Sequence, residues 1–288
     1  MFEDPTVAKR QLLKDKHSVL EGYVTEYLFE RQFLMQAPER YTHGWWAAET
    51  FGKRFFFLVA DKLNDMDRRI MQELSRQYPC WRAYYHKNTW YFRRGLRRLS
   101  LRQFILKYQL RARSGIMSAA ADTRNSDRQN RCIDFFEKNQ ILHRIAMERC
   151  FADDILSVYF GSLVNIDFFV QKDNGQLNAI EVKFKFESKN GKFGINCGQY
   201  NLFEQLGQMG IQVQHWILYN GTHDDSLSIF GFLDSDLAKF WLSGTILTND
   251  QRVKKTAPSK TSVYGSRPQE YYEFEKNEFS RRTPLRIQ

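Results

Sequence analysis

Two neighbouring segments in the middle of the chain show the alternation that is typical of β-strands. Residues 162–170 are rich in β-branched and aromatic types, and they lead into residues 171–175, which contain the Asn-Gly pair of tight hairpins. In residues 177–186 the even-numbered positions from 180 onward are apolar, whereas Glu181 and Lys183 fall on the opposite face. The pattern therefore predicts a β-hairpin with charged residues along one face.

Further elements flank this hairpin. We expect helices at residues 140–152 and 198–209 and a strand at residues 213–219, from their apolar patterns. Alternating helices and strands predict an α/β fold, and we place this unit at residues 131–236. Residues 237–288 are expected to form a C-terminal extension that is partly irregular.

The first part of the chain, residues 1–130, is rich in aromatic and basic side chains, and we expect it to be mainly helical. Apolar residues at helical spacing between Leu101 and Tyr108 predict an amphipathic helix over residues 93–113, with a cationic second face. Residues 118–130 are small and polar, which indicates a linker or a long loop.

The composition is that of a globular protein. The chain has 288 residues, of which 42% are hydrophobic, and its longest apolar run, residues 55–60, is far shorter than the roughly 20 residues of a membrane span. The first residues lack the pattern of a signal peptide, so we expect a soluble, cytoplasmic protein without a membrane partner. The four cysteines have no metal-binding or redox spacing and are expected to be reduced core residues.

Positive charge is concentrated in one segment. The formal net charge is +10, and the segment between Leu74 and Ala121 has eleven basic residues but no acidic one. Aromatic residues are interleaved with these cations, as in surfaces that bind nucleic acid. An acidic protein partner or a membrane surface would also suit the charge, and the aromatic rings could instead fill a core. The candidate nucleic-acid-binding residues are Arg93, Arg94, Arg97, Arg98, Arg102 and Lys107.

The hairpin also carries a candidate catalytic group. Pairing of its strands brings Asp167 and Glu181 to one end of a sheet, with Lys183 one step along the strand. Carboxylate oxygens suit Mg²⁺ or Mn²⁺, and a neighbouring ammonium group can orient a water molecule for attack on phosphorus. Alternatively, Asp167 is a hydrogen-bonded edge residue, and Glu181 and Lys183 form the solvent face of an amphipathic strand.

Asp167 followed by Glu181-Val182-Lys183 resembles the D…ExK signature of the PD-(D/E)xK, or restriction-endonuclease-like, nuclease superfamily. This resemblance implies a core in the order helix, three strands, helix, strand, with a mixed central sheet flanked by helices. It also implies that the carbonyl group of Val182 is a metal ligand together with the two carboxylates. The resemblance spans residues 148–219, and the chain order agrees with the helices and strands expected above.

Two further residues match this family pattern. Many members have an acidic residue on the first core helix, for which Glu148 is the candidate metal ligand and catalytic residue. Several have a glutamine near the start of the helix after the motif, and Gln199 matches it. Without the resemblance, Glu148 could be a surface residue whose role falls to Asp153 or Asp154, and Gln199 could be a helix cap.

These observations predict a metal-dependent endo- or exodeoxyribonuclease that uses Mg²⁺ or Mn²⁺ and acts on nucleic acid, with DNA favoured over RNA. A homodimer or a protein partner is also compatible with the sequence. Two alternatives belong to other functional classes. One is a nucleic-acid-binding protein without catalysis on a nuclease-like scaffold, and the other is a basic adaptor subunit of a DNA transposition or defence complex.

Overall fold

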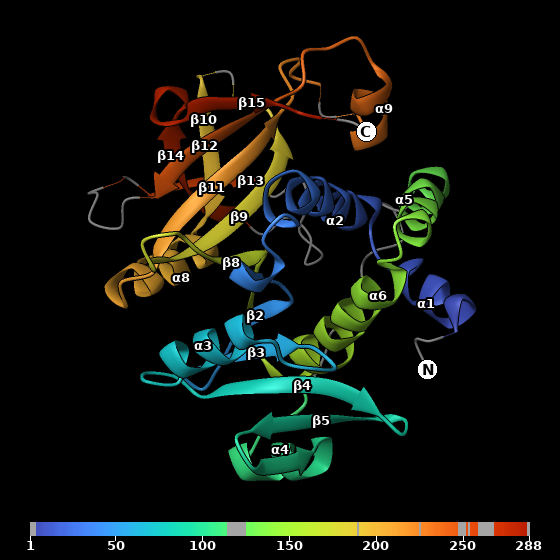
Figure 1. Ribbon diagram of the computed structural model, residues 1–288, viewed down its shortest axis with the longest axis vertical. Coiled ribbons are helices and arrows are strands. Elements are labelled where there is room, and N and C mark those ends of the chain that lie inside the picture. Colours follow the sequence, from blue (N-terminus) through green and yellow to red (C-terminus); the bar gives the residue numbers. More distant parts are fainter. Residues whose placement is uncertain are drawn as a thin grey trace.

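The computed structural model describes residues 4–113, 125–188, 190–224, 226–246, 252, 254–258 and 268–286. It is a mixed α/β structure in which two large sheets lie in the upper and lower halves of the view in Figure 1. A third, three-stranded sheet adjoins the upper half. The α/β class expected from the sequence is therefore confirmed.

The upper sheet is mixed and has the strand order β1-β8-β9-β11-β12-β15. Only the central pair, β9 and β11, runs parallel; the other neighbours among these strands are antiparallel. The strands are β1 (Tyr41–Thr42), β8 (Phe168–Gln171), β9 (Leu177–Lys185), β11 (Gln212–Tyr219), β12 (Phe240–Ile246) and β15 (Ser280–Pro284).

The lower sheet has the order β6-β5-β4-β3-β2-β7, with β3 and β4 parallel. Its strands are β2 (Trp45–Thr50), β3 (Lys53–Val59), β4 (Cys80–His86), β5 (Thr89–Arg94), β6 (Arg97–Ser100) and β7 (Ser162–Ile166). The small sheet consists of β10 (Lys192–Asn196), β14 (Pro268–Glu275) and β13 (Lys254–Pro258).

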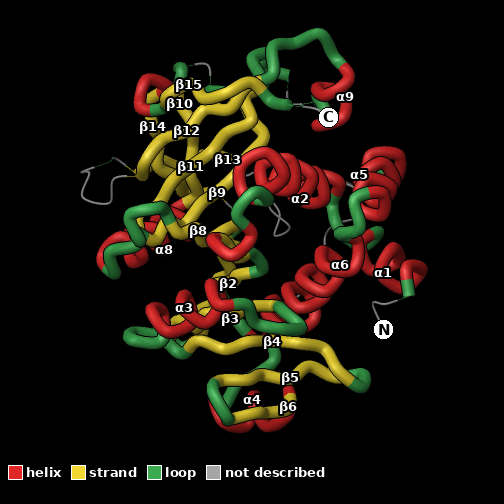
Figure 2. The backbone as a smooth tube through the Cα atoms, in the orientation of Figure 1, coloured by secondary structure: helices red, strands yellow, loops and turns green. Residues whose placement is uncertain are grey.

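Helices α1, α2, α5 and α6 gather beside the sheets, on the right of Figure 2. The α-helices are α1 (Pro5–Leu12), α2 (His17–Phe29), α3 (Asp65–Leu74), α4 (Leu101–Tyr108), α5 (Ser126–Lys138), α6 (Leu142–Phe151), α7 (Ser157–Tyr159), α8 (Cys197–Gln208) and α9 (Ile229–Asp234). Short π-helical turns follow α2 (Glu30–Leu34) and α6 (Ala152–Leu156), and 3-10 turns cover Pro38–Arg40 and Lys276–Glu278. Of the helices described here, none is long and apolar enough to cross a membrane.

The two large sheets are joined through one bent pair of antiparallel strands. In the upper sheet Thr42 of β1 is paired with Phe169 of β8, and in the lower sheet Trp45 of β2 is paired with Ile166 of β7. Only His43 and Gly44 separate β1 from β2, and only Asp167 separates β7 from β8. Both strands therefore change sheets at the same place, which we call the bend.

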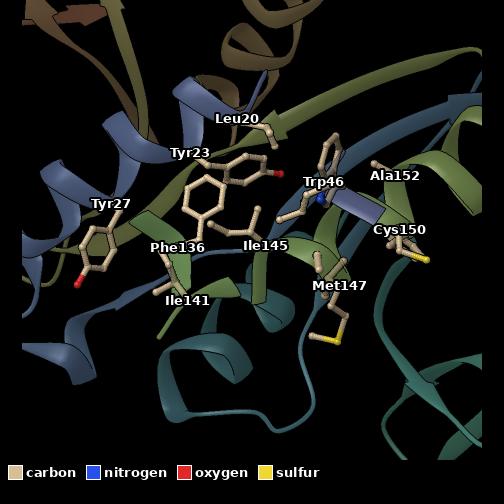
Figure 3. Close-up of a cluster of buried hydrophobic side chains, with 14 of the residues drawn as sticks. Leu20, Tyr23, Tyr27, Trp46, Phe136, Ile141, Ile145, Met147, Cys150 and Ala152 are labelled. Carbon is tan, nitrogen blue, oxygen red and sulfur yellow. The ribbon is translucent and has the colours of Figure 1, made fainter. Parts of the chain in front are cut away.

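Two hydrophobic cores hold these layers together. One is formed where α2, α5 and α6 pack against the sheets, and Figure 3 shows Leu20 and Tyr23 of α2 beside Phe136 of α5 and Ile145 of α6. The other lies on the opposite side, under α3 and α8. Because β9 is covered on both faces, Glu181 is buried, and the alternative that places it on a solvent face is wrong.

Several expected elements are confirmed. The helices expected at residues 140–152 and 198–209 are α6 and α8, and the strand expected at residues 213–219 is β11. The hairpin is formed by β8 and β9, with Gly175 in the left-handed conformation in its turn (φ 81°). The cysteines expected in the core are buried at positions 80, 132 and 150, whereas Cys197 is half-buried.

The continuous strand expected over residues 162–170 is wrong, because it is interrupted at Asp167 and divided between two sheets. The carboxylate of Asp167 accepts a hydrogen bond from the backbone N–H of Val182, at a distance of 2.7 Å. This bond takes the place of the backbone–backbone hydrogen bond that a continuous strand would form with Val182. Between α6 and α8 the chain forms four strands, β7 to β10, where the restriction-endonuclease-like core was expected to have three, and these strands are divided among the three sheets.

The expectation that the N-terminal region is mainly helical is also wrong, since residues 41–100 form the strands β1 to β6 and only one α-helix, α3. The helix expected over residues 93–113 is confined to α4 (Leu101–Tyr108). Before it, β5 and β6 form a hairpin, because Trp90 and Phe92 are buried with a period of two and Gly95 supplies a turn with positive φ.

The remaining differences concern the connecting segments. Within the expected linker at residues 118–130, residues 126–130 belong to α5, and residues 118–124 lie outside the described part of the chain. In the C-terminal extension, β12 and β15 join the upper sheet, and β13 and β14 form the small sheet with β10. The extension is therefore integrated into the fold where the structure describes it.

Gly44 is required at the bend for two reasons. Its φ angle is 78°, and a Cβ atom there would lie 3.0 Å from the carbonyl oxygen of Val59 and 3.3 Å from Oε1 of Glu148. We expect Gly44→Ala to lower the free energy of unfolding by about 1–2 kcal/mol for the left-handed backbone and by a further roughly 1–3 kcal/mol for the crowding.

Gly52→Ala is the matched control for this measurement. Gly52 has a φ of 69°, but a Cβ atom there would have no neighbour within 4 Å, so only the backbone cost should appear. Urea unfolding of both variants checks the expectation. Equal losses of stability would show that the contact with Val59 and Glu148 does not constrain the bend.

Candidate active site

Asp167 lies at the bend and is almost completely buried, with 3% of its surface exposed. One carboxylate oxygen accepts from the N–H of Val182, and the other accepts from the side-chain amide of Asn165 at 3.2 Å. In an extended strand the N–H and C=O of one residue face the same neighbour. The carbonyl of Val182, a ligand implied by the resemblance, therefore also faces the edge at which Asp167 lies.

Glu181 and Lys183 follow on β9 and meet Asp167 through a shared ammonium group. Nζ of Lys183 forms a salt bridge with Oε1 of Glu181 and lies 4.0 Å from Oδ2 of Asp167. Glu181 is 1% exposed, whereas the side chain of Lys183 is 38% exposed. The three motif residues thus converge, and the partly exposed side chain of Lys183 places its ammonium group beside a buried pair of carboxylates.

Two side chains hold Glu181 in place. Gln199, near the start of α8, donates from Nε2 to Oε1 of Glu181 at 2.6 Å. The N-terminal cap of α8 comes instead from Asn196, whose side chain accepts from the N–H of Gly198, so the capping role considered for Gln199 is wrong. The ring of His215 on β11 lies 3.2 Å from the backbone oxygen of Glu181, at its Nδ1 atom.

Glu148 approaches from α6 and is 4% exposed, so the surface position considered for it is wrong. Nδ1 of His43 lies 3.6 Å from its Oε1 atom, which places the bend, α6 and the motif in one neighbourhood. Asp153 does not take over this position, because it is bound to Arg149 at 2.7 Å, and Asp154 accepts from the thiol of Cys150.

Glu26 of α2 also belongs to this group, although the sequence analysis did not identify it. It is half-buried and interacts electrostatically with Asp167, Glu181, Lys183 and Glu148. A signal was present in the sequence: Glu26 lies in HSVLEGYVTEYLF, a largely apolar helix in which a carboxylate is unusual. The four carboxylates and Lys183 form what we call the acidic cluster.

Burial and mutual repulsion shift the acidity of this cluster. Burial, reinforced by the charge of Glu181, raises the pKa of Asp167 to about 8. Burial and the charge of Asp167 likewise raise the pKa of Glu26. Although burial opposes it, the charges of Glu181 and Asp167 raise the pKa of Lys183, so this side chain is an ammonium ion at neutral pH.

The cluster has the properties of a cation site that a single lysine only partly neutralises. Oε2 of Glu181 is buried and has no hydrogen-bond partner among the described residues. Across all the residues that the structure describes, no three carboxylate, imidazole or thiol groups are arranged around one point as metal ligands. The ammonium of Lys183 instead lies beside both Asp167 and Glu181. The donor set of hard oxygens and the excess negative charge nevertheless fit a divalent cation.

The candidate nucleic-acid-binding residues lie at the opposite end of the lower sheet, on and around the β5–β6 hairpin. All six side chains are exposed, namely Arg93, Arg94, Arg97, Arg98, Arg102 and Lys107. They do not form one helical face, because Arg93 pairs with Arg98 and Arg94 with Arg97 across the hairpin. Of the aromatic residues nearby, Trp81, Trp90 and Phe92 fill the core, as the alternative reading of this segment held.

Comparisons of the chain with protein-family models, curated proteins and solved structures find no match. The resemblance to PD-(D/E)xK nucleases therefore rests on the motif residues in the sequence.

The crowded carboxylates predict a measurable pH dependence. The pKa of Asp167 is about 8 in the folded state and about 3.9 in an unfolded chain, so its protonation favours folding at low pH. This contribution is present below pH 4 and is lost as the pH rises through about 8. In a metal-chelating buffer, Asp167→Asn should lack the decline, because an amide cannot ionise.

Urea unfolding of both proteins between about pH 5 and about pH 9 checks this expectation. The stability of the variant relative to the parent should increase with pH, by at most about 1.4 kcal/mol per pH unit. An amide is accommodated if Asn165 reverses its own amide, whose oxygen has no hydrogen-bond partner among the described residues. Parallel profiles would show that the pKa of Asp167 is not raised in the folded protein.

Proposed function

We propose that this protein is a metal-dependent nuclease that hydrolyses phosphodiester bonds of nucleic acid, with DNA as the expected substrate. The observation that carries the proposal is the convergence of Asp167, Glu181 and Lys183 on one buried point, with Gln199 bound to Glu181. Such a cluster costs stability, since buried carboxylates repel one another. A catalytic role accounts for keeping them together.

Asp167 and Glu181, with the carbonyl of Val182, would hold Mg²⁺ or Mn²⁺ beside the scissile phosphate, and Glu148 would add negative charge from α6. When bound, the ion supplies Lewis-acid stabilisation of charge on the phosphoryl oxygens and the leaving group. The residues themselves fix the geometry: Asn165 and the N–H of Val182 orient Asp167, and Gln199 orients Glu181.

Lys183 has a separate role in this scheme. As an ammonium ion with a partly exposed side chain, it donates hydrogen bonds and cannot accept a proton. It would therefore orient the attacking water and the phosphate by hydrogen bonds, without removing the proton of the water. Attack by that water forms a new P–O bond and releases a proton to solvent, while the P–O bond to the leaving sugar oxygen breaks and that oxygen takes up a proton from solvent.

The first test separates the two roles by substitution. Asp167→Asn should lower cleavage about a thousandfold, which corresponds to the several kcal/mol that an ion supplies, and should also weaken Mg²⁺ or Mn²⁺ binding. Lys183→Met should lower cleavage about 10²–10³-fold but leave ion binding intact or tighter, because Glu181 loses a competing cation.

Lys192→Met is the matched control, since Lys192 lies on β10 and is paired with Glu275, away from the acidic cluster. Cleavage of labelled single- and double-stranded DNA and RNA, followed over time with Mg²⁺, Mn²⁺ or chelator, gives the activity, and calorimetric titration gives the ion affinity. Wild-type cleavage by both motif variants on a substrate that the parent cuts would exclude this catalytic assignment.

A second test concerns Glu26, which faces Asp167 from α2. Removing its charge should weaken binding of the divalent ion and cleavage together, by about 10–100-fold, as for other residues that surround metal ligands. Glu26→Gln keeps the shape of the side chain, and Glu39→Gln, which alters an exposed residue paired with Arg40, is the control. Unchanged ion affinity in Glu26→Gln would remove Glu26 from the site.

A further inference from the structure

Three arginines lie directly opposite one another on the outer face of the lower sheet. Arg82 of β4 is paired with Arg93 of β5, which is in turn paired with Arg98 of β6. Like charges at directly opposed positions destabilise a sheet. Among the described residues, none of the three forms a salt bridge, whereas the nearby Arg68 and Arg76 are paired within their own segment. An anionic ligand would relieve the repulsion in this row.

Two tyrosines form the next row on the same face. Tyr84 is paired with Tyr91, and their rings are stacked with centroids 5.7 Å apart and planes inclined by 22°. The guanidinium group of Arg98 lies 4.0 Å from the centre of the Tyr91 ring, and that of Arg82 lies 4.4 Å from the Tyr84 ring. We call the three arginines (Arg82, Arg93 and Arg98) and the two tyrosines (Tyr84 and Tyr91) the arginine–tyrosine face. It combines cations with planar groups on which nucleic-acid bases stack.

Helix α3 covers the neighbouring part of the sheet and forms a wall beside this face, as Figure 1 shows for α3 and β4. Between the wall and the strands lies a cavity of about 660 Å³. Its charged lining residues are all basic: Lys62, Arg68, Arg82, Arg93 and Arg94. The cavity is therefore suited to phosphate groups.

A second cavity of about 390 Å³ adjoins this basic cavity. The two cavities share Lys62 and Leu63 as lining residues. At its other end the second cavity reaches His43, whose Nδ1 atom lies 3.6 Å from Glu148. Arg82 and Arg93 of the arginine–tyrosine face line the basic cavity, and His43, beside Glu148, lines the second, so the two adjoining cavities extend from this face towards the candidate active site.

We infer that the two adjoining cavities form a groove, which binds a single-stranded segment of nucleic acid and leads it from the arginine–tyrosine face to the acidic cluster. The inference rests on the proposed function for what happens at the inner end. Arginines would bind the phosphates, and the tyrosine rings and guanidinium planes would stack on bases. A duplex would not satisfy this face, because its base faces are stacked on one another and are hidden from the tyrosines.

The first experiment measures binding of a fluorescein-labelled, mixed-sequence DNA strand of about 16 nucleotides in a chelating buffer over a range of KCl concentrations. Removing two phosphate contacts with the double variant Arg93→Gln, Arg98→Gln should weaken binding at least about tenfold. It should also make the slope of log K against log salt less steep by about 1.4, from roughly 0.7 per contact.

The tyrosines give a different signature. The double variant Tyr84→Leu, Tyr91→Leu should weaken binding about tenfold or more but leave the salt slope unchanged, because stacking releases no counterions. The double variant Arg10→Ala, Arg286→Ala removes the same charge at exposed positions outside the groove and is the control. Equal effects of the control and groove variants, or tighter binding of the matching blunt duplex by the parent, would overturn the inference.

The second experiment locates the strand on the parent protein, so that it does not depend on the folding of a variant. Ultraviolet cross-linking of the same DNA containing 4-thiothymidine, followed by peptide mass spectrometry, should label Tyr84 or Tyr91 and the segment between Pro38 and Lys62. Cross-links that fall only elsewhere would overturn the groove. Neither readout requires cleavage: groove binding without hydrolysis would contradict the proposed function alone, and hydrolysis without groove binding would contradict the groove alone.

Discussion

The bend in the β1–β2 and β7–β8 ladder is the constraint on which the rest of the candidate site depends. Asp167 ends one ladder by accepting the N–H of Val182, and Gly44, on the opposite strand, brings the backbone close to Glu148. This arrangement frees the edge of β9 after Ile180, where Glu181 and Lys183 follow. Without the bend, a continuous β7–β8 strand would cover that edge and keep the helices from reaching Asp167.

The same arrangement lowers the stability of the fold, because it brings buried carboxylates close together. Carboxylates from α2, α6, β9 and the bend interact with one another, and one lysine supplies most of the compensation. Two aromatic-rich cores, which pack against β9 from both sides, stabilise the fold against this repulsion. At the far end of the lower sheet the balance is reversed, since three arginines face one another and form no salt bridge with a carboxylate in the described part of the chain. A polyanion that spans both ends would experience attraction along the groove and would need a cation at the acidic end.

The parts of this architecture that local patterns specify could be predicted from the sequence. The β8–β9 hairpin follows from alternation and an Asn-Gly turn, and the motif on it brought Asp167, Glu181 and Lys183 together as expected. The bend could not be predicted, because the residues of β7 and β8 form one uninterrupted strand pattern. Glu26 was missed for a related reason: its place beside Asp167 depends on the packing of α2 against β9, which is a long-range contact. The helix expected over residues 93–113 is wrong before residue 101, because only the residues from Leu101 to Tyr108 have helical spacing and the basic residues before them form a hairpin.

The central claim is that the bend assembles a divalent-cation site from Asp167, Glu181 and the carbonyl of Val182. Anomalous diffraction from crystals soaked in Mn²⁺ tests it most directly, since the ion is located without reference to any activity. We expect an anomalous peak between these three groups, with Lys183 displaced from Oε1 of Glu181. Mn²⁺ bound only at other positions, with the Lys183–Glu181 salt bridge intact, would contradict it.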